Sequence, residues 1–142
     1  MKALLRTTLA ALLLSPFAAA HTFTLSLGPA AGAVDYFGVI CSNESGADTD
    51  HLQMQVRTET VGGPLVSVQV RKGEVVTNTT DPINGDAEFS QVTNTPGGNG
   101  LYGVTVTKTG AGSVVFTLTV HCLNKAGDIH TGTDGVVYQY QP

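Results

Sequence analysis

Three of the four histidines have residue types and positions that could together bind a metal ion. Cleavage of the chain before His21 would give this residue a free α-amine beside its own imidazole, and such a pair chelates one metal ion. His121 ends an expected strand and His130 follows a short loop, so a hairpin would bring their rings together. An amine and several imidazole nitrogens form a planar donor set, which suits Cu(II) best among the common divalent ions. The candidate metal site therefore consists of His21, His121 and His130, and Cu(II) is the expected ion. The simpler alternative is that these histidines are exposed and bind no metal.

The cut before His21 is predicted by the twenty residues that precede it. A short apolar run, residues 8–14, lies between basic residues and a stretch of small ones. Ala18 and Ala20 occupy the third-last and last positions before the cut, where signal peptidases need small side chains. The run is much shorter than the roughly 20 apolar residues of a retained anchor. We expect residues 1–20 to be a cleaved signal peptide of bacterial type, which makes the mature protein periplasmic or extracellular and without a membrane span. A terminal His21 then resembles the histidine brace of known copper proteins.

Cys41 and Cys122 are the only cysteines, and both fall on the apolar side of an expected strand. Export to an oxidising compartment makes a disulfide their default state. A thiolate metal site or a redox pair would favour two cysteines close together in the sequence, whereas these lie far apart. We therefore expect a structural disulfide.

Charge and motif content exclude several functions. Seven basic residues face eleven acidic ones, and the formal net charge of −4 comes with no basic run, so a nucleic-acid partner is not expected. The chain has no Gly-x-Ser-x-Gly motif, and both cysteines are assigned to the disulfide, so we expect no enzymatic activity. Oxygen ligands in the segment DPINGDAE suggest calcium, but their spacing departs from the EF-hand and suits ordinary turns.

Alternating apolar and polar residues predict an all-β fold. Seventeen glycines, no tryptophan and only 13% charged residues are typical of a turn-rich β protein. We expect a single antiparallel β-sandwich domain, residues 21–142, of jelly-roll or immunoglobulin-like type. Its roughly eight strands are expected at residues 23–27, 35–41, 51–57, 65–71, 87–92, 101–108, 114–122 and 135–141. Residues 66–70 and 114–120 carry the most regular large apolar side chains, so they should form the least exposed strands.

The segments DYFGVIC, LVSVQVRKG and GNGLYGVTVTKTGAGSVVFTLTV resemble bacterial pre-peptidase C-terminal domains. Those domains carry an Asp-x-Tyr/Phe strand, a Val-x-Val core strand, and a Gly-x-Tyr-x-Val-x-Val strand that leads through a Gly-rich hairpin. The matching positions are Asp35, Phe37, Val39, Val68, Val70, Gly100, Tyr102, Val104, Val106, Gly110, Gly112, Phe116, Thr117 and Leu118. The resemblance covers about residues 28–122 and implies a secreted β-sandwich accessory module.

Together these features predict an exported, noncatalytic module that binds a secreted protein or a glycan. A periplasmic copper-binding protein that uses His21 is the alternative, and a small secreted hydrolase with paired carboxylates ranks third.

Overall fold

The computed structural model describes the chain from residue 21 to residue 140, and its side chains up to residue 135. The predicted signal peptide, residues 1–20, lies outside this range. The described residues form nine strands and no helix. In chain order the strands are β1 (His21–Leu27), β2 (Val34–Ser42), β3 (His51–Thr58), β4 (Val66–Lys72), β5 (Val75–Thr80), β6 (Thr93–Pro96), β7 (Gly100–Lys108), β8 (Val114–Leu123) and β9 (Gly132–Tyr140).

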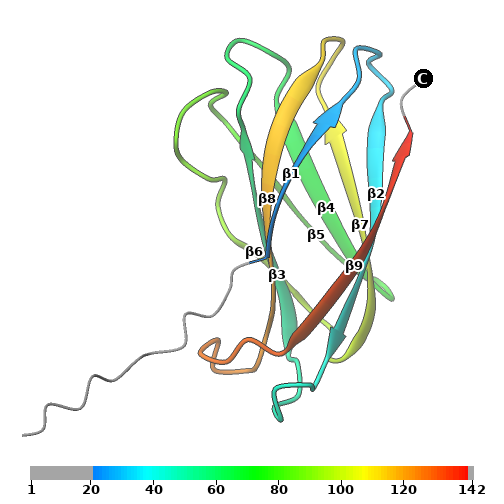
Figure 1. Ribbon diagram of the computed structural model, residues 1–142, viewed down its shortest axis with the longest axis vertical. Helices are drawn as coiled ribbons and strands as arrows, with labels where there is room; N and C mark the ends of the chain where they lie inside the picture. Colours follow the sequence, from blue (N-terminus) through cyan, green and yellow to red (C-terminus); the bar gives the residue numbers. More distant parts are fainter. Residues whose placement is uncertain (1–20, 141–142) are drawn as a thin grey trace, which may run out of the picture.

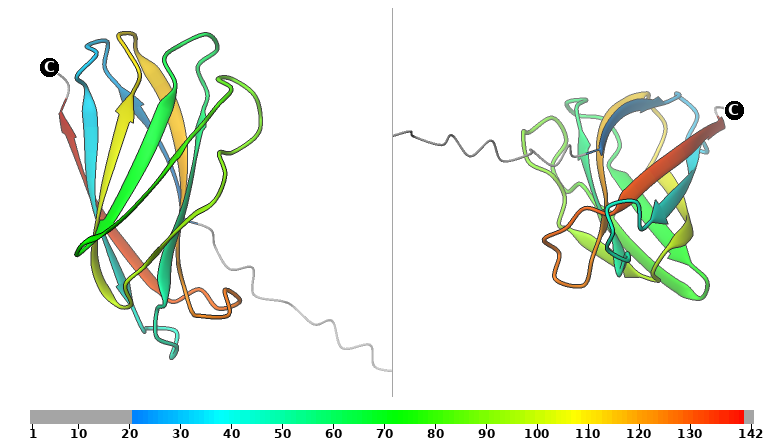
Figure 2. Two further views of the ribbon diagram at one scale, coloured as in Figure 1. Left: turned by 180° about the vertical axis from the view of Figure 1, so that it is seen from behind. Right: turned by 60° about the horizontal axis from the view of Figure 1, so that its bottom comes forward.

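The strands make two antiparallel sheets that face each other across the core (Figure 1, Figure 2). The four-stranded sheet has the order β1-β8-β3-β6, and the five-stranded sheet has the order β5-β4-β7-β2-β9. The predicted antiparallel β-sandwich is thus confirmed, with nine strands where about eight were expected. Residues 21–140 contain no helix that could cross a bilayer.

The core consists of the inward residues of the alternating strands. In β4 the side chains of Val66, Val68 and Val70 are fully buried, while Gln69 between them is exposed. The inward residues of β8 are equally buried, but so are those of β3 and β7, and β3 has no exposed residue, so the prediction that β4 and β8 are the least exposed strands is wrong. Branched and aromatic side chains on one face of each strand supply the apolar area that holds the sheets together.

The strand predicted at residues 87–92 is wrong. This segment belongs to a long loop, and the strands of the region are β5 before it and β6 after it. β5 is an edge strand whose inward residues are the threonines Thr77 and Thr79, so its sequence shows no apolar alternation. Ser90 in the loop still pairs with Val56 of β3, because its amide donates to the Val56 carbonyl and its Oγ accepts from the Val56 amide.

The disulfide joins the two sheets. Cys41 of β2 and Cys122 of β8 are bonded with an S–S distance of 2.00 Å, and both are buried. The predicted bridge is therefore confirmed. Along one side of the sandwich, Thr77 of β5 and Thr95 of β6 share a hydrogen bond of 2.5 Å between their hydroxyls. Along the other side, the free edges are β1 and β9, which belong to different sheets.

Candidate metal centre

His121 and His130 lie side by side at one end of the sandwich. Their ring centroids are 4.6 Å apart, and the rings are tilted by 45°. His121 lies on the outer face of β8, because Val120 and Cys122 on either side of it are buried in the core. His130 forms an isolated antiparallel bridge with Leu123, the last residue of β8, and this bridge sets the spacing of the two rings.

The expected hairpin between the two histidines is present only as a short antiparallel closure, in which the Asn124 amide donates to the Ile129 carbonyl and the Thr131 amide donates to the Cys122 carbonyl. β8 pairs with β1 and β3, whereas β9 pairs with β2 in the other sheet. The loop between them, drawn in orange at the bottom of Figure 1, therefore crosses from one sheet to the other. Asn124 closes this loop, since its Oδ1 accepts hydrogen bonds from the amides of Asp128 and Ile129. The closed loop returns His130 to the end of β8.

The spacing of the two rings suits a shared metal ion. Two imidazoles whose nitrogens lie about 2.0 Å from one metal ion have centroids about 4.5 Å apart when they subtend a right angle. The observed 4.6 Å matches this value. This centroid distance is compatible with two ligands of one metal ion, and it is equally the distance of two rings in ordinary contact.

The ring of His121 is poorly solvated and carries an unused nitrogen. Its Nε2 is buried and has no hydrogen-bond partner among the described residues. Burial lowers the pKa of His121 below its ordinary value, and the nearby His130 and His21 lower it further. A histidine that stays neutral keeps a lone pair available, which is the form that binds a metal.

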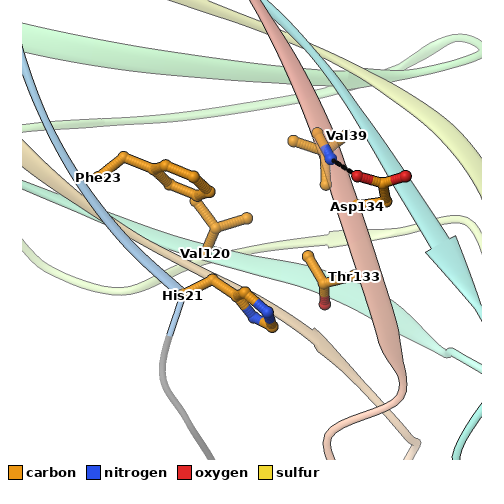
Figure 3. A pocket seen from close by; sticks show the side chains of 7 residues that line it. His21, Phe23, Val39, Val120, Thr133 and Asp134 are labelled. Carbon is orange, nitrogen blue, oxygen red and sulfur yellow. Dashed lines mark hydrogen bonds between the residues drawn. The ribbon is translucent and has the colours of Figure 1, made fainter.

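His21 lies near this pair but faces a different side of the sheet. It is paired with Val120, and together with Phe23 the two residues line one wall of a pocket of about 250 Å³ (Figure 3). Paired residues share a face of the sheet, so the His21 ring is on the inner side whereas His121 is on the outer side. His21 still lies close enough to lower the pKa of His121.

The three histidines are therefore neighbours rather than a preformed three-ligand site. Among the described residues, no group of three His, Cys, Asp or Glu side chains is arranged to hold a metal ion. Chelation by all three would require His21 to leave the β1–β8 ladder, because side chains on opposite faces of a sheet cannot meet by rotation alone. His21 is the exposed first residue of the edge strand β1, so its release would break only the last pair of this ladder.

The opposite wall of the pocket was not predicted from the sequence. Val39 of β2 and Thr133, Asp134 and Gly135 of β9 face His21 across the gap between the two sheet edges. The Asp134 carboxylate accepts a hydrogen bond of 2.8 Å from the Gly135 amide. In the sequence, Asp-Gly resembles an ordinary turn, and nothing in it places these residues opposite His21.

The other candidate ligands have structural contacts. The His51 Nδ1 lies 3.1 Å from the Asp50 carboxylate. In the segment considered for calcium, the buried Asp81 accepts hydrogen bonds from the amides of Thr58 and Ile83, while Asp86 accepts one from the amide of Glu88. These carboxylates stabilise loops.

Comparison with protein families, curated proteins and solved structures found no match for this chain. The resemblance to pre-peptidase C-terminal domains stays a prediction.

Proposed function

We propose that this protein is an exported, noncatalytic β-sandwich module that binds copper(II) at His21, His121 and His130. The observation that carries the proposal is the His121–His130 pair, in which two rings 4.6 Å apart accompany a buried Nε2 that has no partner among the described residues. A buried nitrogen of this kind is costly unless something binds it. A metal ion would bind it and would use the second ring at the same time.

His21 adds the donors that favour copper. After cleavage of the predicted signal peptide, its α-amine and imidazole would supply two nitrogens, and the paired rings would supply two more. Four nitrogens in a plane suit Cu(II), whereas Zn(II) favours a tetrahedron. The excess of acidic residues, with a formal net charge of −4, adds a general attraction for cations.

Two features support a binding role rather than a catalytic one. Asp81 and Asp86 already accept backbone hydrogen bonds, and Glu59 is bound by Arg57 and Thr117. These carboxylates are thus engaged in contacts that hold loops and strands. The disulfide between the sheets suits a module that must persist outside the cytoplasm.

The test is Cu(II) titration of the protein that begins at His21, followed by calorimetry and electron paramagnetic resonance. We expect one Cu(II) per chain, with hyperfine splitting from several nitrogens. The variants His121→Ala and His130→Ala should each weaken binding at least tenfold. The matched control is His51→Ala, which removes a histidine held by Asp50 and should leave the affinity unchanged. Unchanged affinity in the His121→Ala, His130→Ala double variant would refute the assignment.

A further inference from the structure

A hollow of about 300 Å³ lies on the outer face of the five-stranded sheet, on the opposite sheet from β8 and its histidine pair. Its floor is formed by Gly103 of β7, which is paired directly with Gly38 of β2. Gly103 is paired on its other side with Arg71 of β4. Tyr36, Arg71, Gly73 and Leu101 line the hollow around Gly103.

The backbone does not require either glycine. Neither Gly38 nor Gly103 has a positive φ, so any residue could adopt these conformations. A glycine inside a strand is destabilising relative to alanine, and it often marks a place where another group approaches the backbone closely. Gly103 thus gives the hollow a low floor, whereas the Leu101 side chain lies over Gly38, 3.2 Å from where a Cβ atom there would be.

Tyr36 lies over this floor. A Cβ atom placed on Gly103 would be 3.1 Å from the Tyr36 hydroxyl and 3.8 Å from two ring carbons. The ring therefore leans across the sheet rather than standing out from it, and it covers the glycine as aromatic residues do elsewhere. Tyr36 nevertheless remains 49% exposed, which leaves much of the aromatic surface open to solvent.

Polar side chains border the exposed ring. Thr105 of β7 is paired with Tyr36, and Gln69 of β4 is paired with Thr105, so the three share one row of the outer face. Arg71 lies in the next row, where its Nε donates a hydrogen bond of 2.9 Å to the Gly73 carbonyl. The hollow is thus lined by the Tyr36 ring and by Arg71, while Gln69 and Thr105 lie in the neighbouring row outside its lining.

We propose that this hollow binds a neutral saccharide. A pyranose ring has an apolar face of C–H groups, which can stack on the open surface of Tyr36, and a rim of hydroxyls, which Gln69, Thr105 and Arg71 can bind. An aromatic body with a few convergent polar groups is typical of small-molecule sites. The acidic net charge disfavours a polyanionic chain, so the ligand is a neutral sugar polymer. This site is independent of the copper site.

The test is affinity electrophoresis of the mature protein in native gels that contain soluble neutral polysaccharides: hydroxyethylcellulose, galactomannan or arabinoxylan. A parallel gel contains polygalacturonate. We expect at least one neutral polymer to retard the protein. Tyr36→Ala should weaken this binding at least tenfold, whereas Tyr36→Phe, which keeps the ring, should bind within about threefold of the wild type.

Gly103→Ala provides a second variant, which keeps every side chain around the hollow. Its new methyl would press on the Tyr36 hydroxyl and shift the ring, so retardation should fall. Gly32→Ala is the matched control, because a Cβ there would meet nothing within 4 Å. Thermal unfolding and Cu(II) affinity of each variant separate a loss of the saccharide site from a loss of the fold or of the metal site.

Three outcomes would overturn the proposal. They are no retardation by any of the neutral polymers, retardation by polygalacturonate alone, and unchanged retardation of a folded Tyr36→Ala variant.

Discussion

Reduction of the Cys41–Cys122 disulfide should remove a large part of the stability of the fold. The bridge closes a loop with a sequence separation of 81 residues. In the chain-entropy model, opening a loop of this length stabilises the unfolded chain by about 4.5 kcal/mol. Domains of this size have a total free energy of unfolding of about 5–15 kcal/mol, so the reduced protein should keep only a small margin.

Urea unfolding at pH 7, followed by far-ultraviolet circular dichroism, measures this effect. The chain has four tyrosines and no tryptophan, so tyrosine fluorescence provides a second probe. With a slope of about 1.5 kcal/mol per M of urea, the loss of about 4.5 kcal/mol lowers the midpoint by about 3 M. Oxidised and reduced protein are compared in the same buffer, with a phosphine reductant added after unfolding so that the buried bond is accessible.

A Cys41→Ala, Cys122→Ala double variant controls for incomplete reduction. Both positions are buried, so the double variant should be at least as unstable as the reduced protein, because it also leaves small cavities. A reduced protein within 1 kcal/mol of the oxidised one would show that loop closure does not stabilise this sandwich, and it would refute the argument from the unfolded state.

Three further outcomes follow from single side chains. Val68→Asp should lower the free energy of unfolding in urea by roughly 3–5 kcal/mol, because it places an unpaired charge in the core. Gln69→Asp at the exposed neighbouring position should lower it by less than about 1 kcal/mol. Equal losses would contradict the assignment of the two faces of β4. Asp81→Ala should lower the free energy of unfolding by about 1–3 kcal/mol, since it leaves the buried Thr58 amide without its acceptor, and Asp81→Asn should lower it less. An alanine variant as stable as the wild type would contradict the role of this carboxylate. Burial lowers the pKa of His121 in the folded state, so the unfolded chain binds a proton at higher pH than the folded chain does. The free energy of unfolding of metal-free protein should therefore fall as the pH drops below about 6.5, and His121→Gln should remove part of this slope; identical slopes in the two proteins would contradict the buried environment.

Strands with one buried face could be predicted from the sequence because apolar and polar side chains alternate along them. In β8, Phe116, Leu118 and Val120 alternate with threonines, and this pattern alone predicts the strand and its inward face. The disulfide could be predicted from the number of cysteines and the expected export. Both inferences rest on local composition or covalent chemistry, which the sequence carries directly.

Features that depend on the pairing of distant segments could not be predicted. The inward positions of β5 are the threonines Thr77 and Thr79, and β6 has only four residues, so neither shows the apolar alternation of a half-buried strand. The loop after β8 crosses between the sheets, although its sequence suits a hairpin equally well. The face of His21 is an exception, because it could have been predicted. When the alternation of inward residues is continued from Phe23 to the strand's first residue, it places His21 on the inner face, where it lies. The wall opposite His21 depends on the position of β9 in the other sheet.

The central claim is that Cu(II) binds through the amine of His21, and one measurement tests it most directly. The Cu(II) affinity of the protein that begins at His21 is compared with that of a variant carrying one extra alanine before it. The variant keeps every imidazole but loses the primary amine from the chelate, so its affinity should fall at least a hundredfold, and His21→Ala should match it. Equal affinity of the two proteins, or binding weaker than micromolar in both, would contradict the claim.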